Sequence, residues 1–326
     1  MTRFFFGPAS GLPLALYRIA FGVLGVLYTL QLVRYFKDYY GHQGVLRPAT
    51  VLALGSAGHP QILPAWLPDG ALWLALAALA GASAALACGY RTRMAAIAVF
   101  VLLSSFYFRN VLVACGAERI LRFCAFWLLF LPADLPLSVD RYLAVRRGDR
   151  VPTTIAPWPQ RMIAIQIAVV YLTTFFTKTQ GETWISGTAV YYAQHYVLAS
   201  NKATALPLLD LTMVNIATYA TLAAELALGT LVWFRGTRLP VLAGGIALHA
   251  GIAWNLGLWY FSAVMIGSYL CFLDRADLAR LRRLARRALP RCLEKHHRHG
   301  GGGVEGLGPA GHRDGDGLVG QGQGVP

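Results

Sequence analysis

Charged residues are scarce in this chain. Asp, Glu, Lys and Arg make up 13% of its 326 residues, whereas hydrophobic residues make up 56%. Because soluble domains carry about twice as many charged residues, the composition excludes a water-soluble globule. A bilayer core takes roughly 20 apolar residues per helix, which leaves room for about eight helices with short connections. We therefore predict an all-α integral membrane protein, a polytopic bundle of about eight transmembrane helices.

Paired cysteines and metal-binding motifs are also lacking. The five cysteines are an odd number, form no CxxC pair and lie mostly in or beside apolar runs, as small packing residues do. A group of possible metal ligands, Cys292, His296, His297 and His299, lies beside a Gly-rich stretch that offers no fixed geometry. We therefore expect neither a disulfide framework nor a metal site.

Apolar runs divide the chain and predict its helices. They lie at about 11–35, 70–88, 94–108, 118–133, 158–180, 211–234, 239–257 and 258–273, of which the fourth and eighth are short for a span. Small residues predict where helices approach closely in lipid. They are Gly22 and Gly25 in the first run, and Ala77, Gly81 and Ala85 in the second.

Basic residues gather in alternate connections between these runs. They occur at Arg91 and Arg93, within 141–150, at Arg235 and Arg238, and in the tail. With eight spans, all of these fall on the same side as the N-terminus, and the positive-inside rule assigns that side to the cytoplasm. We predict a multi-pass protein of the cell membrane with both termini cytoplasmic.

The region after the last apolar run is strongly basic. Residues 275–299 carry half of the net charge of +14. Directly after a span, such a stretch is typical of an anchor to anionic headgroups, and the chain has no room for the folded basic face that nucleic acid needs. We predict a transmembrane domain at 1–273, a basic interfacial helix at 274–299 and a disordered Gly-rich tail at 300–326. Membrane lipids are the expected partners, and nucleic acid is not.

Two charged residues lie deep within apolar runs, where charge is costly. Arg18 is about 10 Å from the start of the first run and Glu225 about 13 Å from the end of the sixth. Their matching depths predict a structural ion pair, with a proton pathway as the alternative. His249 lies near the middle of the seventh run, where it either hydrogen-bonds a neighbouring helix or acts as a ligand.

A second polar group gathers where helices end on the outer side. Its members are Arg109, Asn110, Glu118, Arg119, Arg122, Lys178, Glu182 and Asn255. Long side chains at helix ends can simply reach the headgroup layer. Lys178, however, directly follows an apolar stretch and precedes a turn into Trp184. Burial there disfavours the charged amine and makes the neutral amine available as a base.

The stretch YLTTFFTKTQGETWISGTA at 171–189 resembles the central motif of the HTTM family, bacterial membrane relatives of vitamin K-dependent gamma-carboxylase. Further similar pieces follow the family's order. They are YRIAFG at 17–22, YGHQGVL at 40–46, LP at 131–132, SVDR at 138–141, Glu225, His249 and FSAVM at 261–265. Each piece is short, but together they cover residues 11–273 of a multispan chain.

The resemblance implies a role for Lys178, because a matching lysine in the animal carboxylases is the base that deprotonates vitamin K hydroquinone. A quinol entering from the lipid is the cofactor that this likeness implies. The predicted catalytic residues are Lys178, His249 and Glu182, and the predicted cofactor-binding residues are Trp184, Arg122, Arg119 and Asn255.

Three functions fit these features. The first is a membrane enzyme that uses Lys178 on a lipid-soluble, quinol-like or membrane-delivered substrate; arginine could not replace this base, because arginine does not lose its proton at neutral pH. The second is a non-enzymatic accessory for maturation or export of a secreted peptide, which would need its outer loops and a protein partner. The third is a structural or lipid-binding protein that depends on the basic tail.

Overall fold

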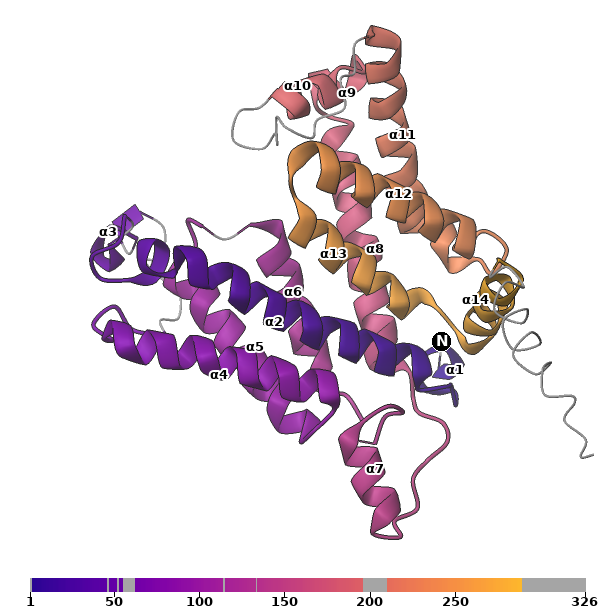
Figure 1. Cartoon of the computed structure of the whole chain (residues 1–326). Coiled ribbons are helices and arrows are strands. Elements are labelled where there is room, and N and C mark those ends of the chain that lie inside the picture. The colour runs from indigo at the N-terminus through magenta and orange to yellow at the C-terminus, as the bar shows by residue number, and fades with distance from the viewer. Residues whose placement is uncertain are drawn as a thin grey trace, which may run out of the picture. The chain divides into compact units, whose positions relative to one another are not determined.

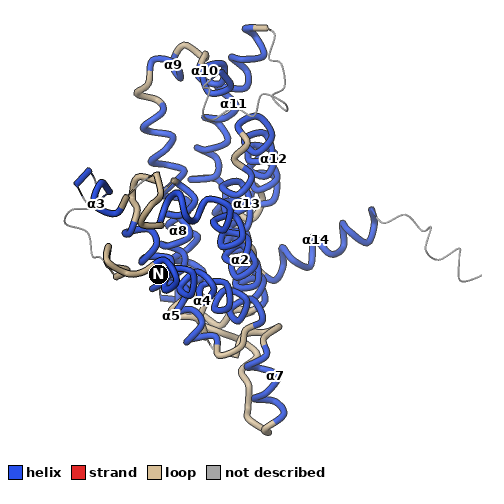
Figure 2. The backbone as a smooth tube through the Cα atoms, turned by 60° about the vertical axis from the view of Figure 1, so that its left-hand side comes forward, coloured by secondary structure: helices blue, strands red, loops and turns tan. Residues whose placement is uncertain are grey.

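The computed structural model describes residues 2–45, 47–51, 53–54, 62–113, 115–132, 134–195 and 210–288. Helices dominate this part of the chain and no strand occurs in it (Figure 2), apart from an isolated bridge between Ala9 and Ile155. The chain divides into two compact units, residues 1–279 and 280–326. The predicted tail at 300–326 and the possible metal ligands within 292–299 lie outside the described residues.

The all-α membrane bundle predicted from composition is confirmed. Within the described ranges, six helices are long and apolar enough to cross a bilayer. They are α2 (Leu12–Tyr40), α4 (Asp69–Cys88), α5 (Thr92–Arg109), α8 (Trp158–Lys178), α11 (Leu211–Thr230) extended by the 3-10 turn η2 (Leu231–Trp233), and α12 (Arg238–Leu256).

The fourth and eighth apolar runs form shorter helices. These are α6 (Gly116–Leu128) and α13 (Trp259–Ser268), which continues as the 3-10 turn η3 (Tyr269–Phe272). The 13 residues of α6 extend over about 20 Å, less than the roughly 30 Å of a bilayer core. The remaining helices are α1 (Thr2–Phe6), α3 (Pro48–Val51), α7 (Val139–Arg146), α9 (Glu182–Ile185), α10 (Ala189–His195) and α14 (Arg275–Ala288).

The short helices still carry the chain back across the bundle. Asp140, which follows α6, accepts hydrogen bonds from the backbone N–H groups of Arg91 and Thr92 where α5 begins. Gln160 at the start of α8 donates to the carbonyls of Cys271 and Leu273 at the end of η3, at 3.0 Å each. Among the described residues, six of the eight apolar runs form helices of spanning length, and the other two form the shorter α6 and α13.

Helices α2 and α4 lie side by side (Figure 1) because small residues let their backbones meet. A Cβ added to Gly22 would lie 2.5 Å from the amide nitrogen of Ala87, and one added to Gly25 would lie 2.5 Å from Ser83 Oγ. The predicted close approach at these glycines is confirmed. On α4 the predicted stripe is wrong, because Gly81 has no atom within 4 Å of such a Cβ.

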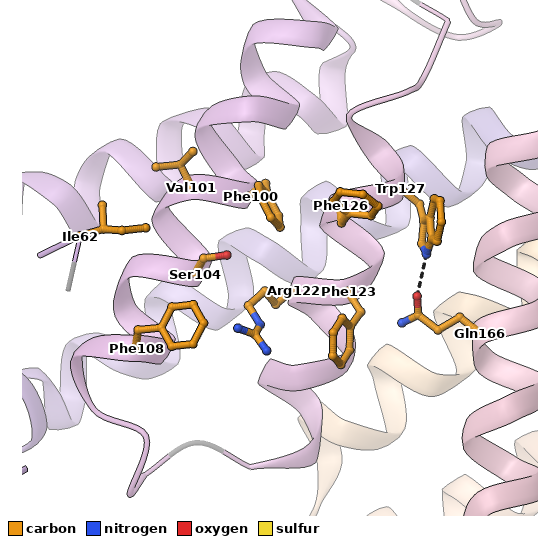
Figure 3. Close-up of a pocket in the computed structure, with 10 residues that line it drawn as sticks. All are labelled: Ile62, Phe100, Val101, Ser104, Phe108, Arg122, Phe123, Phe126, Trp127 and Gln166. Atoms are coloured by element: carbon orange, nitrogen blue, oxygen red, sulfur yellow. Dashed lines mark hydrogen bonds between the residues drawn. The ribbon is translucent and has the colours of Figure 1, made fainter. Parts of the chain in front are cut away.

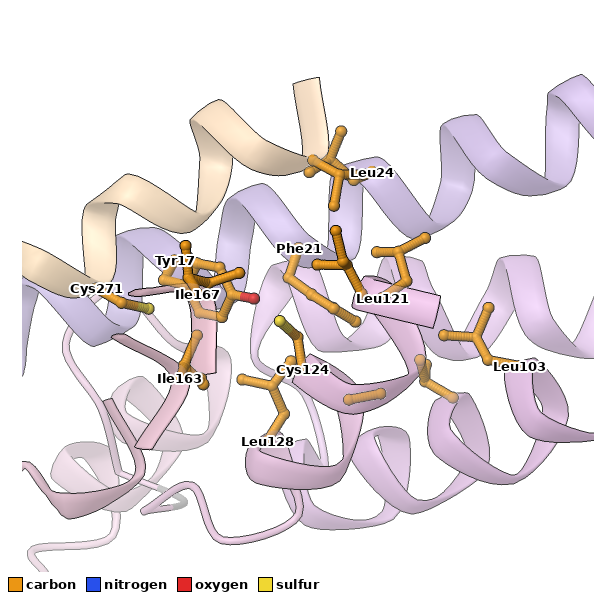
Figure 4. Packing of buried hydrophobic residues seen from close by; sticks show 14 of the residues in the cluster. Tyr17, Phe21, Leu24, Leu103, Leu121, Cys124, Leu128, Ile163, Ile167 and Cys271 are labelled. Atoms are coloured by element: carbon orange, nitrogen blue, oxygen red, sulfur yellow. The ribbon is translucent and has the colours of Figure 1, made fainter. Parts of the chain in front are cut away.

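The short helix α6 is held by a buried apolar face. Figure 4 shows Cys124 and Leu128 of α6 gathered with Tyr17 of α2 and with Ile163 and Ile167 of α8, and all five are buried. Along α6, residues 121, 124, 125 and 128 recur at helical spacing and are buried, whereas Phe123 and Phe126 are exposed. Amphipathic spacing therefore places α6 between the longer helices.

Arg18 does not pair with Glu225, which corrects the sequence-based prediction. Its guanidinium is fully buried and donates to the carbonyl oxygen of Leu86 at 3.0 Å and that of Leu137 at 2.6 Å. The last carbonyls of a helix have no partner within the helix. Arg18 therefore joins the end of α4 to the segment before α7. The similar depths of Arg18 and Glu225 in their apolar runs did not identify the neighbours of Arg18.

A second arginine performs the same task at the opposite end of the bundle. Arg109, the last residue of α5, donates to the carbonyls of Leu63, Pro64 and Tyr40, the shortest bond being 2.7 Å to Pro64. The neighbouring Asn110 donates to Tyr39 at 2.7 Å. These two residues of the predicted outer polar group therefore fasten the end of α2.

The basic connections meet at the end of the bundle where α2 begins. Arg238 of α12 donates to Asp277 at 2.6 Å and to Asp274 at 3.2 Å, both at the start of α14. Burial acts to raise the pKa of Asp274, but the backbone N–H of Asp277 and the guanidinium of Arg238 outweigh it and lower the pKa below its usual range. Together with the contact of Asp140 to Arg91, the contacts of Arg238 bring the basic connections to one end of the bundle.

Candidate functional site

Lys178 and Glu225 form an ion pair between α8 and α11. The Glu225 side chain is 8% exposed and the Lys178 side chain 26% exposed, so the pair lies mostly inside the protein. One carboxylate oxygen of Glu225 binds the ammonium, and the other has no hydrogen-bond partner among the described residues. The arrangement leaves one carboxylate oxygen of Glu225 without a partner beside the Lys178 ammonium.

Close packing of α8 against α11 brings these two residues together. A Cβ added to Gly229 of α11 would lie 2.6 Å from the side chain of Leu172 and 3.4 Å from the carbonyl oxygen of Ala168, both on α8. This contact shifts α11 along α8, so that Glu225, one turn before Gly229, comes within reach of the last residue of α8. Sequence analysis counted the depth of each residue from the end of its own helix, which assumes that the helix ends are level with one another. It therefore did not identify the pairing of Lys178 with Glu225.

Trp184 packs over the Lys178 ammonium. The chain turns at Gly181, whose N–H donates to the carbonyl of Lys178 at 2.9 Å, and then forms α9. This turn places the ring centroid of Trp184 4.6 Å from Lys178 Nζ, within the range of a cation–π interaction. The structure therefore brings together Lys178 and Trp184, two of the site residues predicted from sequence.

A cavity of about 750 Å³ opens beside this pair, between α11 and α12 and next to α9 and α10. Its walls consist mostly of small or apolar side chains, which leave space between the helices. The lining residues are Lys178, Trp184, Val190, Ala193, Gln194, Ala217, Ala220, Thr221, Ala224, Gly244, Ala247, Leu248, Gly251, Ile252, Asn255 and Leu256. Lys178 is the charged group in this mostly apolar lining.

Asn255, predicted to bind a cofactor, lines the same cavity. Its side-chain oxygen accepts a hydrogen bond from Gln194 Nε2 at 3.0 Å, and its amide nitrogen donates to the carbonyl of Gly251 at 2.9 Å. The contact joins α10 to α12. Sequence analysis did not identify Gln194, since a glutamine in an amphipathic segment carries no distinguishing pattern.

His249 lies outside the cavity lining and belongs to a buried polar chain. Its Nε2 is 2.8 Å from the hydroxyl of Tyr171, which is 2.7 Å from the hydroxyl of Tyr269. His249 is 2% exposed and its ring packs 5.6 Å from that of Phe261. His249 therefore does not line the Lys178 cavity, because its ring contacts Tyr171 of α8 and Phe261 of α13 instead.

The other predicted site residues do not line the Lys178 cavity. Glu182 and Arg119 are exposed and line no described cavity. Arg122 lines a second cavity between α5, α6 and α8 (Figure 3). The predicted grouping of Arg119 and Arg122 with Lys178 is wrong, because α6 packs beside α5, α8 and α13 and does not reach the cavity between α11 and α12.

Metal binding finds no support in the described ranges. No group of three or more His, Cys, Asp or Glu side chains that could hold a metal ion occurs there. The polar groups that the structure does bring together are a lysine, a carboxylate and an indole beside an apolar cavity. Such a set can hold and transfer a proton next to a lipid-soluble molecule.

The fold and this arrangement define a multi-pass helical membrane protein with a partly buried Lys–Glu pair. The family model of the HTTM domain matches residues 6–276, and the chain belongs to the HTTM domain family. It is similar to "Uncharacterized protein YitO" of Bacillus subtilis (strain 168), with 31% identity over 122 residues. That match covers 36% of this chain and 39% of the relative. No solved structure matches the chain.

Proposed function

We propose that this HTTM protein is a membrane enzyme that removes a proton from a lipid-soluble substrate in the cavity between α11 and α12. Lys178 is the base, and Glu225 is its partner. The observation that carries the proposal is the partly buried Lys178–Glu225 pair at the wall of a mostly apolar cavity. A lysine that only reaches the headgroup layer needs no buried carboxylate beside it.

The pair supplies the base through a proton shift. Burial disfavours separated charges, so the proton of the Lys178 ammonium can pass to Glu225 and leave a neutral amine beside a neutral acid. The amine then takes a proton from the substrate at Nζ and becomes ammonium again. The face of the Trp184 ring stabilises that cation. Loss of the proton from Glu225 returns the pair to its starting state.

The cavity suits an apolar molecule with one acidic hydroxyl group. Alanine and glycine residues of α11 and α12 form part of its walls, and Lys178 is its charged member. A quinol has this character, and it is the cofactor that the carboxylase resemblance implies. Oxidation of a quinol supplies reducing equivalents to dioxygen, while the chain's own residues hold the ring and accept its proton. A peptide delivered at the membrane is the second reactant that the resemblance implies.

The orientation of the chain belongs to the same proposal. The end of the bundle that holds the basic connections faces the cytoplasm of the cell membrane, and the Lys178 end of α8 faces outward. The contacts of Asp140 with Arg91 and of Arg238 with Asp277 support a common side for these connections. The helix α14, with basic residues along its length, then lies against anionic lipid on that side.

The test uses the purified full chain in liposomes, with a reduced naphthoquinol as the probe and dioxygen uptake as the readout. Ala220 lines the cavity, whereas Ala223 of the same helix is exposed and does not. We expect Ala220→Trp to abolish most of the uptake and Ala223→Trp to retain it. An accessory protein would instead give no uptake above protein-free liposomes, and this result would reject the enzymatic proposal.

A further inference from the structure

A second cavity, separate from that of Lys178, lies between α5, α6 and α8 and measures about 580 Å³. Figure 3 shows its walls, which are formed largely by aromatic side chains, among them Phe100, Phe108, Phe123 and Phe126. Arg122 extends into this aromatic space from α6 (Figure 3). The cavity therefore combines a large apolar wall with a cation.

The positive charge of Arg122 is not compensated by an acid. None of the described carboxylates forms an ion pair with it, and its Nε is buried without a hydrogen-bond partner. The guanidinium carbon instead lies 4.1 Å from the ring centroid of Tyr107, 4.8 Å from that of Phe108 and 5.2 Å from that of Phe123. Ring faces attract the cation but offer no oxygen to its N–H donors. The Arg122 guanidinium can therefore still bind an anionic acceptor.

The polar groups of this cavity lie in an order that fits an amphiphile. Arg122 contacts Tyr107 and Phe108, the last residues before Arg109 ends α5, so the cation lies near one end of the bundle. Farther along α6, Trp127 Nε1 donates to Gln166 Oε1 at 2.6 Å. The amide nitrogen of Gln166 is buried, has no partner and points toward Phe123 in Figure 3. An unpaired amide donor therefore lies beyond the aromatic part of the cavity.

We propose that this second cavity, a groove between α5, α6 and α8, is a binding site for one membrane lipid with an acidic headgroup. The guanidinium of Arg122 binds the phosphate, whose oxygens accept the in-plane N–H groups. The acyl chains lie along Phe100 and Phe126, and the Gln166 amide donates to an ester carbonyl. Charge complementarity carries this assignment, because a cation among apolar side chains is costly until an anion binds it, and the exposure of Val101 and Phe123 leaves the cavity open to a ligand. The site is independent of the Lys178 chemistry.

The experiment is native mass spectrometry of the purified full chain with two lipids of equal chain length, dioleoyl phosphatidylglycerol and dioleoyl phosphatidylcholine. We expect one tightly retained phosphatidylglycerol per chain. Arg122→Gln should reduce the preference for phosphatidylglycerol roughly fivefold, the factor that corresponds to about 1 kcal/mol. Arg119→Gln, an exposed arginine one turn earlier on α6, should leave the preference unchanged.

Two further arms complete the test. Val101 lines the groove and is 39% exposed, so Val101→Trp should block the lipid without removing the cation. Glycerol phosphate, which is the headgroup without chains, should not displace the lipid at equal concentration. Equal retention of the two lipids by the wild type would overturn the proposal, and so would an unchanged preference in folded Arg122→Gln or Val101→Trp. Displacement by glycerol phosphate would reject a lipid in favour of a small anion.

Discussion

Glu225 of α11 pairs with Lys178 of α8, while Arg18 of α2 binds backbone carbonyls 68 and 119 residues further along the chain. The two buried charges that the sequence placed at equal depth therefore serve different purposes. Arg18 satisfies a helix end, which is a structural task. Glu225 holds an ammonium beside a cavity, which is where proton chemistry can take place.

Loss of either member of the Lys178–Glu225 pair should destabilise the protein more than loss of both. Glu225→Ala leaves an ammonium mostly buried without its partner, and a broken buried pair costs about 3–5 kcal/mol. The double variant Lys178→Met, Glu225→Leu removes both charges and should recover much of this loss. Thermal unfolding in detergent, followed by fluorescence, measures the three variants. Additive losses would contradict the pair.

Arg18 and Glu225 should behave independently. Arg18→Met removes donors to Leu86 and Leu137 and should lower the yield of folded protein, because those carbonyls lose their partner. Combined with Glu225→Gln, the two losses of stability should add to within about 0.5 kcal/mol, as they do for residues without shared contacts. Strong coupling between them would instead favour the ion pair expected from their depths.

Glycines 22 and 81 provide a matched comparison. Gly22→Leu should disrupt the contact between α2 and α4, since its Cβ alone would lie 2.5 Å from the backbone of Ala87. Overpacking costs about 1–3 kcal/mol and more where backbone must move. Gly81→Leu should be tolerated, because its Cβ meets no atom within 4 Å. Monodisperse yield in size-exclusion chromatography reports both, and equal tolerance would refute the close approach.

Topology can be tested by reporter fusions at positions 148 and 300. The proposed orientation, with an even number of spans and the basic connections on one side, predicts that both positions lie in the cytoplasm. A reporter that is active only in the cytoplasm should therefore give signal at both sites. A fusion within α10, which follows the Lys178 end of α8, serves as the control and should be silent. An external signal at 148 or 300 would reverse the orientation of the site.

The helices and the neighbourhood of Lys178 could be predicted because their signals are local. Apolar runs have the length of their helices, and Trp184 lies six residues after Lys178, across one turn. The pairing of Lys178 with Glu225 could not be predicted, because it depends on how α11 is shifted along α8. The places of Arg122 and His249 could not be predicted either, because Arg122 lines a separate cavity and His249 contacts Tyr171 of α8 without lining the Lys178 cavity.

Replacement of Lys178 by arginine tests the central claim most directly. Arginine keeps the charge, the pairing with Glu225 and the stacking on Trp184, but it cannot release a proton at neutral pH. With normal amounts of folded protein, Lys178→Arg should abolish quinol-driven dioxygen uptake, as Lys178→Ala should. Lys37→Arg, at an exposed lysine of α2, should leave it unchanged. Full activity of Lys178→Arg would contradict the assignment of Lys178 as the base.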